Sequence, residues 1–118
     1  RQLTGQPIPL AWQPQNLPML SAIEVYPAGT LKMAFAPERV PSYKGSEGGN
    51  GRSAILNKIK PEITLPSQTG LLQHNDDALD AALCVLAGAD FLQGRAEPPT
   101  DWLQAKKEGW IWTRRRSE

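Results

Sequence analysis

The sequence has one cysteine, one histidine and no long hydrophobic run. The single Cys84 cannot form a disulfide within the chain, which favours a reducing compartment. The single His74 excludes a zinc site built from several histidines. The most apolar stretch, residues 77–92, is interrupted by Asp80 and Asp90, and it falls short of the roughly 18 apolar residues of a membrane span. These features predict a cytoplasmic protein that does not cross a membrane.

An excess of charge of one sign is also missing. The 118 residues include 13 Lys and Arg against 12 Asp and Glu, whereas dedicated nucleic-acid-binding domains are usually clearly basic. A chain of this length can form a single domain that buries roughly 65% of its unfolded surface. Three arginines at 114–116 follow Trp110 and Trp112. They could contact phosphates, but we expect residues 114–118 to be a solvated basic tail.

Prolines and glycines divide the chain into short segments. Four prolines within residues 1–20 exclude a helix or a central strand there, and we expect an extended arm whose apolar side chains lie on a neighbouring surface (Ile8, Leu10, Trp12, Leu17 and Met19). Elsewhere, apolar periodicity and turn residues define the elements. The expected elements are a strand at 22–26, a helix that opens at Pro27 and runs through 30–35, a flexible glycine-rich loop at 37–51, a helix at 52–59, a connection at 61–72, a long helix at 76–93, a helix at 101–107 and a strand at 109–113.

The long helix has an unusual pattern. Its apolar residues point all round the axis, so we expect it to be covered on more than one face, with Leu83 and Leu86 fully buried. Three acids nevertheless occupy its first two turns. Asn75 or Asp76 can act as the N-cap, and the helix dipole favours acids in the first turn. Asp80 lies a full turn inside, so the pattern leaves two readings open: capping, or a metal or catalytic site.

Several motifs occur in an order that resembles one family. They are Ser-Ala-Ile-Glu-Val-Tyr-Pro at 21–27, Tyr43-Lys44, the helix start at Arg52, Asp77-x-x-Asp80-Ala81 and the closing Glu-Gly-Trp-Ile-Trp at 108–112. Together they span residues 21–113 and resemble domain of unknown function family 429, a group of predicted RNase H-like nucleases. The resemblance implies an α/β fold that corresponds to the C-terminal half of an RNase H-like domain. It would have a small sheet, a long buried helix, and a domain at 21–113 between the arm and the tail.

The resemblance also implies a function. Glu24, Asp77 and Asp80 would be the catalytic acids that hold Mg²⁺ or Mn²⁺, and Lys44 and Arg52 would contact the phosphates of a nucleic-acid substrate. The chain would be the C-terminal part of a metal-dependent nuclease that hydrolyses phosphodiester bonds. The leading strand of the family, with its Asp, would lie upstream of residue 1. We therefore expect this chain alone to be inactive.

Three further expectations can be compared with a structure. The carboxyl group of Glu24 should lie within ~10 Å of Asp77 or Asp80 if they share metal ions. Asp90, near the end of the long helix, should be exposed or paired with Arg95, because the helix dipole disfavours an acid there. An open strand edge would favour a two-fold homodimer. The competing function is a non-catalytic interaction module, in which the helix acids are caps and the proline-rich arm is a docking surface.

Overall fold

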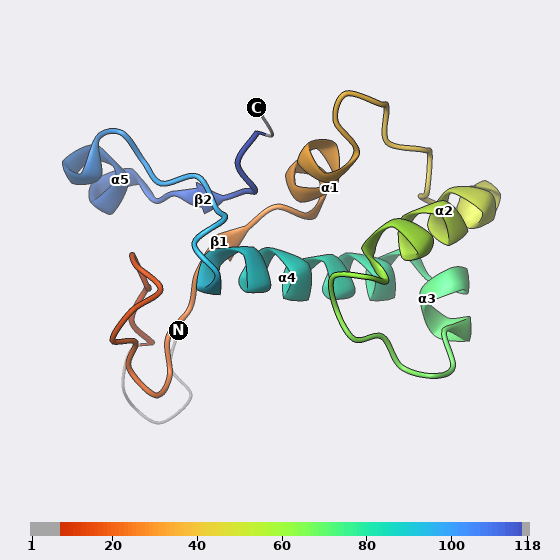
Figure 1. The fold of residues 1–118 in the computed structure, drawn as a ribbon, viewed down its shortest axis with the longest axis horizontal. Helices are drawn as coiled ribbons and strands as arrows, with labels where there is room; N and C mark the ends of the chain where they lie inside the picture. Colours follow the sequence, from red (N-terminus) through yellow and green to blue (C-terminus); the bar gives the residue numbers. More distant parts are fainter. Residues whose placement is uncertain (1–7, 117–118) are drawn as a thin grey trace.

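The computed structural model describes residues 8–116, and a long central helix organises them (Figure 1). In chain order the elements are strand β1 (Glu24–Val25), helix α1 (Pro27–Phe35), the 3₁₀ turn η1 (Ser46–Gly48), and helices α2 (Gly49–Ile59), α3 (Gly70–His74), α4 (Asp76–Leu92) and α5 (Trp102–Glu108), followed by strand β2 (Ile111–Trp112). Helix α1 packs along α4, α2 and α3 lie at the N-terminal end of α4, and β1, β2 and α5 lie towards its C-terminal end. The α/β class and the long helix are therefore confirmed. Within residues 8–116, no helix is long and apolar enough to span a membrane.

Helix α4 begins and ends where the sequence indicates. The Asn75 side chain is the N-cap and accepts a hydrogen bond from the backbone N–H of Ala78 at 3.0 Å. Asp76 and Asp77 follow in the first turn, where the positive end of the helix dipole stabilises carboxylates. Just past the last turn, Gly94 has a φ of 72°, a left-handed conformation that favours glycine.

One broad face of α4 is buried. Leu83 and Leu86 are fully buried, as predicted. The prediction that α4 is covered on more than one face is wrong for the side opposite this buried face. There Val85 and Leu92 are 62% and 59% exposed. The described part of the chain has no element that covers that side.

Two hydrophobic cores share α4. The larger core lies between α1, α2, α3 and the first three turns of α4, and it consists of Leu31, Tyr43, Ile55, Leu56, Ile59, Leu72, Leu79, Leu83 and Leu86. The smaller core lies where the arm and the strands meet the last turn of α4. Its buried members are Ala11, Phe91, Ala96 and Trp112. Because one continuous helix contributes to both cores, it sets the separation between the two ends of the molecule.

The sheet is small and parallel. Glu24 pairs with Ile111 and Val25 with Trp112, and single bridges add a segment of the arm at Leu10 and the segment at Ala96. The arm is therefore held by backbone pairing, with Trp12 and Leu17 packed on the smaller core. Met19 is fully exposed, so no surface within the described residues covers this side chain. The arm's first seven residues, and residues 117–118 of the tail, lie outside the described part of the chain.

The glycine-rich segment is more ordered than expected. Residues 46–51 form η1 and the first turn of α2 instead of a flexible loop. A Cβ at Gly51 would lie 1.8 Å from the carbonyl oxygen of Ser42, and a Cβ at Gly48 would lie 2.3 Å from the carbonyl carbon of Tyr43. Glycine is therefore needed for the close approach of two backbones, which the sequence pattern does not distinguish from flexibility. Helix α3 also forms partly within the expected connection.

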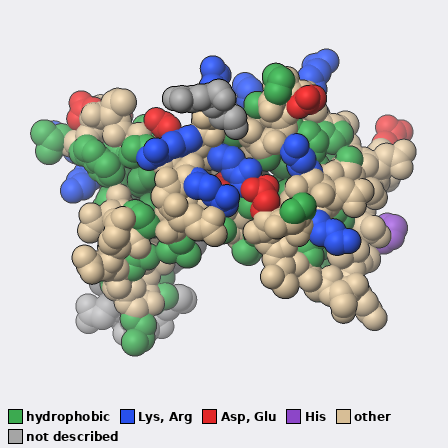
Figure 2. All heavy atoms as spheres, viewed as in Figure 1, with side chains coloured by type: hydrophobic (Ala, Val, Ile, Leu, Met, Phe, Trp, Pro, Cys, Tyr) green, Lys and Arg blue, Asp and Glu red, His purple; other side chains and the backbone are tan. Residues whose placement is uncertain are grey.

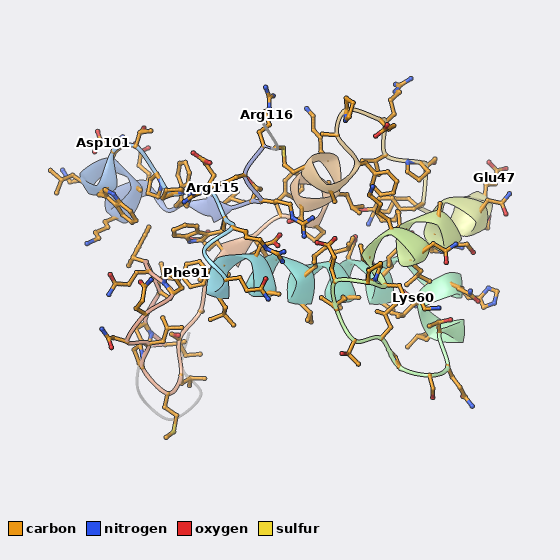
Figure 3. All side chains as sticks on the ribbon, in the orientation of Figure 1. Glu47, Lys60, Phe91, Asp101, Arg115 and Arg116 are labelled. Atoms are coloured by element: carbon orange, nitrogen blue, oxygen red, sulfur yellow. The ribbon has the colours of Figure 1, made fainter. Side chains whose placement is uncertain are left out.

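The prediction of a solvated tail that begins at residue 114 is also wrong, because the Arg114 side chain is bound to two acids of the fold. Its guanidinium donates to both carboxylate oxygens of Asp90, at 3.1 and 3.0 Å, and pairs with Glu62 at 2.8 Å. Asp90 is buried and also pairs with Arg95 at 3.0 Å, as expected. Arg115 is also tied to the fold, since its backbone N–H donates to the carbonyl oxygen of Arg95 at 2.9 Å. Arg116 fits the prediction better, because it is exposed and points away from the helices (Figure 3).

Candidate functional site

Two acids from successive turns of α4 meet a distant loop. The Tyr43 hydroxyl donates to Oδ1 of Asp80 at 3.0 Å, and the Lys44 ammonium donates to Oδ2 of the same carboxylate. One turn earlier, Oδ2 of Asp76 accepts the backbone N–H of Gly45 at 2.7 Å. We refer to these five residues, Tyr43, Lys44, Gly45, Asp76 and Asp80, as the acid–loop site. Asp80 is therefore not a helix cap; its carboxylate fixes the loop to the helix.

Arg52 holds the same loop from beneath. Its Nη1 donates to the carbonyl oxygens of Tyr43 and Gly45 at 2.8 and 2.7 Å, and its Nε donates to the carbonyl of Gln73 at 2.6 Å. The side chain is buried, and its contacts join α2, the loop and α3. A buried guanidinium bound to three carbonyl groups does not face a phosphate in solution. The structure therefore places Arg52 where it positions the loop.

The contacts within the site shift three pKa values. The Gly45 N–H, followed by the charges of Lys44 and Arg52, lowers the pKa of Asp76. The hydrogen bond to Asp80 raises the pKa of Lys44. Burial, reinforced by the bond to Asp80, raises the pKa of Tyr43. At neutral pH, Tyr43 is thus a protonated donor and Lys44 carries its positive charge.

The three acids implied by the family resemblance do not come together. Asp77 is exposed on α4, three residues before Asp80, and side chains at this spacing are neighbours on a helix. Glu24 lies beside Ile111, and its carboxylate oxygen is 3.1 Å from the position that a Cβ on Gly109 would take. Within residues 8–116, no three His, Cys, Asp or Glu side chains are arranged to hold a metal ion.

The separation of Glu24 from the helix acids has a physical cause. The strand pair is anchored at the far end of α4, where the rings of Trp112 and Phe91 meet at 4.8 Å between centroids. Asp80 and Phe91 are eleven residues apart, or roughly 16 Å along an α-helix. Figure 3 shows Phe91 beneath the strands and Glu47 at the opposite end of the molecule, near the start of α2. In this arrangement Glu24 belongs to the strand end and the acid–loop site to the helix N-terminal end.

The sequence also hid part of this site. The sequence shows Tyr43-Lys44 as a motif, but no sequence pattern indicates that the Tyr43 hydroxyl donates to Asp80. Gly45, with a φ of 72°, lies in the segment predicted to be a flexible loop, yet its N–H donates to Asp76. The loop residues and the helix acids lie far apart in the sequence, so no periodic pattern links them. Only the fold brings them together. His74 is exposed at the end of α3.

Cys84, one helical turn beyond Asp80, is partly buried. Burial and the charge of Asp80 raise the pKa of its thiol. A raised thiol pKa disfavours the reactive thiolate. These surroundings favour Cys84 as a small packing residue rather than as a nucleophile.

The molecular surface divides by character. Figure 2 shows basic and acidic side chains meeting near the middle of one face and hydrophobic side chains gathered over the end formed by α5 and its neighbours. Several of the large hydrophobic side chains at that end are strongly exposed: Met19, Trp102, Leu103 and Ile111.

Comparison with known proteins now identifies the family. The family model described as "Protein of unknown function (DUF429)" matches residues 10–102. The chain belongs to the DUF429 family. The DUF429 match includes β1, α4 and the whole acid–loop site, and it ends before β2, so the closing motif at 108–112 lies outside it. No curated protein and no solved structure matches the sequence.

Proposed function

We propose that this DUF429 chain is the C-terminal portion of an RNase H-like, metal-dependent nuclease, and that the acid–loop site belongs to its active centre. The observation that supports this most directly is the pairing of Lys44 and Asp80 at an accessible position, where their side chains are 57% and 24% exposed. Hydrolysis of a phosphodiester needs acids for a metal and a cation for the phosphate. Both are present here: the acids lie in the first two turns of α4, and the cation lies on the loop that contacts them.

The donor chemistry of the helix acids fits a divalent metal in part. Asp77 and Asp80 would supply carboxylate oxygens, the ligand type that Mg²⁺ and Mn²⁺ prefer. Glu24, implied as a third ligand, does not reach them from its place in β1. The remaining ligands would come from sequence outside these 118 residues, so the chain alone is expected to be inactive. A bound divalent ion would activate water and neutralise phosphate charge.

The chain's own residues then have distinct roles in the proposal. Lys44 contacts a substrate phosphate, Tyr43 orients Asp80, and Arg52 keeps the loop in place. The parallel pairing of β1 with β2, together with the long helix packed beside them, supports the RNase H-like topology. The strand pairing and the helix packing do not depend on which residues would bind the metal.

The test is cleavage by the longest natural polypeptide that contains this sequence. Labelled single-stranded DNA, duplex DNA and RNA–DNA hybrid are incubated with Mg²⁺ or Mn²⁺. Asp77→Asn and Asp80→Asn should each lower the rate by about a hundredfold or more, since loss of a supporting partner alone costs ~10–100-fold at metal sites. Glu47→Gln, an exposed acid in η1, is the matched control and should retain the rate. Full activity in Asp80→Asn would refute the assignment.

One observation favours a second function, an interaction module that pairs with another copy of the chain. At the strand end, Leu103 and Ile111 are 77% and 51% exposed, and large exposed apolar patches typically mark contact surfaces. Sedimentation at micromolar concentration should then show a dimer that Leu103→Glu dissociates. Leu71→Glu, at a 69% exposed position on α3, is the control that should remain dimeric. A monomeric wild-type chain would exclude this alternative.

A further inference from the structure

A cavity of about 720 Å³ lies between α2 and the segment that joins it to α3. Residues 53–60 form one wall, and the other wall is the segment 61–69, which leaves α2, loops outward and returns to α3 (Figure 1). Pockets of about 300–1,000 Å³ typically bind small molecules. None of the five residues of the acid–loop site lines this cavity, so it is a separate place in the fold.

The inner side of the cavity is apolar and belongs to the larger core. Leu56 is 5% exposed, and Ile63 and Leu65 pack against the same core from the segment 61–69. Pro61 and Pro66 extend the apolar lining. Because the core holds Leu56, Ile63 and Leu65 in place, this side of the cavity is formed before a ligand arrives. A matching ligand therefore has an apolar face, such as the face of a planar ring.

Uncharged hydrogen-bonding residues line the cavity as well. Asn57 lies on α2 and Gln73 on α3. A carboxamide has a donor and an acceptor next to each other, and it can match two neighbouring groups on the edge of a nucleobase. Ser53 and Thr69 add hydroxyl groups. A wholly apolar ligand would cover these groups without bonding to them, which is costly, so the lining favours a heterocyclic base.

The charges of the lining select one further group. Two charged residues line the cavity, Lys60 and Glu62. The Glu62 carboxylate is already paired with Arg114 at 2.8 Å. Lys60 is exposed where α2 ends (Figure 3). A single ammonium group suits one phosphate rather than a polyphosphate chain.

We propose that this cavity binds one unpaired nucleotide. Its base lies against Leu56 and the two prolines, the edge of the base is hydrogen-bonded by Asn57 and Gln73, and its phosphate contacts Lys60. Proteins hold extruded bases in the same way, by hydrogen bonds to one edge and apolar contact with the faces. The nucleotide is either free or part of a single strand, since both contain the same base and phosphate. The proposal does not require the nuclease function, because it concerns other residues.

Binding of a fluorescent nucleotide gives the first test. The 118-residue chain is added to 2-aminopurine ribonucleoside 5′-monophosphate, and the fluorescence anisotropy of the nucleotide is measured. The anisotropy should rise to saturation, and adenosine 5′-monophosphate should reverse the rise. Ribose 5-phosphate at the same concentration should not, because it lacks the base. Equal competition by ribose 5-phosphate would overturn the proposal.

Substitutions then assign the contacts. Asn57→Leu and Gln73→Leu should each weaken binding about fivefold or more, because the base loses a hydrogen-bond partner inside the cavity. Lys60→Met should weaken nucleotide binding about two- to fivefold, the strength of an exposed ionic contact, whereas competition by adenosine, which has no phosphate, should be unchanged. Asn50→Leu on α2 and Gln104→Leu on α5 are matched controls outside the cavity and should bind as the wild type does.

Nuclear magnetic resonance locates the site without any substitution. Adenosine 5′-monophosphate is titrated into the nitrogen-15-labelled wild-type chain. The amide signals of residues 53–57 and 63–69 should shift, and those of α5 should not. Shifts confined to other segments, or the absence of saturable binding, would refute the cavity as a nucleotide site.

An oligonucleotide with one central 2-aminopurine distinguishes the two sources of the nucleotide. Binding of the single strand at least tenfold more tightly than the mononucleotide identifies a strand as the ligand, and similar affinities identify a free nucleotide; both results support the cavity. Binding of both probes that is unchanged in Asn57→Leu and Gln73→Leu would refute it. The nuclease assignment would then still depend on its own cleavage test with Asp80→Asn.

Discussion

Replacement of Asp90 by asparagine tests the buried ion cluster that ties the C-terminal segment to α4. The Asp90 side chain is 1% exposed and accepts from Arg114 through both oxygens, while Arg95 pairs with it from the partly solvated side. Asparagine keeps the shape but removes the charge, and its amide group would face a guanidinium donor. The change therefore leaves Arg114 with one carboxylate partner, Glu62.

The expected magnitude follows from these contacts. Breaking a buried ion pair by removal of one partner costs about 3–5 kcal/mol. We expect the lower end, about 3 kcal/mol, because Arg114 keeps Glu62 and the Arg95 side chain is 44% exposed and can be rehydrated. Against a total stability of about 5–15 kcal/mol, this is a large fraction. With a urea m-value of about 1–3 kcal/mol/M, the midpoint should fall by about 1–3 M.

Urea unfolding followed by circular dichroism at the helix band measures the change. Asp101→Asn is the matched control, since Asp101 caps α5 by accepting the Gln104 N–H at 3.0 Å and asparagine caps equally well. Arg114→Met combined with Asp90→Asn should cost less than the sum of the single changes, because the two groups are in contact. A loss below about 0.5 kcal/mol in Asp90→Asn, or strict additivity, would refute the reasoning.

Three other predictions concern the core and the acid–loop site. Leu83→Ala should destabilise the chain by about 2–5 kcal/mol in urea unfolding, whereas Leu92→Ala, at a 59% exposed position of the same helix, should cost below about 1 kcal/mol; equal losses would contradict the buried face. Tyr43 should ionise above the ordinary tyrosine pKa of about 10, so Tyr43→Phe should remove the late step of the absorbance titration at 295 nm, and Tyr26→Phe should retain it. Because the folded-state pKa of Asp76 is lowered, its contribution to stability is present above about pH 4 and is lost as the pH falls through the folded-state value. The urea midpoints of wild type and Asp76→Asn should therefore differ at pH 6, and the difference should shrink as the pH is lowered below about 4; a difference independent of pH would exclude the carboxylate as the cause.

Local sequence signals predicted the bounds of the helices and strands better than they predicted which faces of those elements are buried. The bounds of α4 followed from Asn75 and Gly94, and β1 and β2 formed within the expected segments because apolar alternation and prolines are local properties. The apolar composition of α4 suggested burial all round, yet Val85 is exposed. The apolar composition of a helix does not show which of its faces are buried, because that depends on where other elements pack against it.

The candidate site was predicted in part for the same reason. The sequence indicated Asp80, and the resemblance indicated Lys44, but neither indicated that they pair with each other. Arg52 was expected at a phosphate, whereas its donors point inward to backbone carbonyl groups. The polarity of a side chain does not reveal whether its partner will be a ligand or the protein's own backbone.

The sharing of α4 between the two cores has a consequence for how the molecule opens. Its middle turns cannot separate from one core without disturbing the other, so their amide protons should exchange with solvent only through complete unfolding. The arm is attached near its middle by two backbone bonds, from Ala11 N–H to Ala22 and from Ala22 N–H to Pro9, and it can detach alone. Hydrogen exchange should therefore be slowest at the centre of α4 and fastest in the arm, so that the arm can open while the two cores on α4 stay folded together.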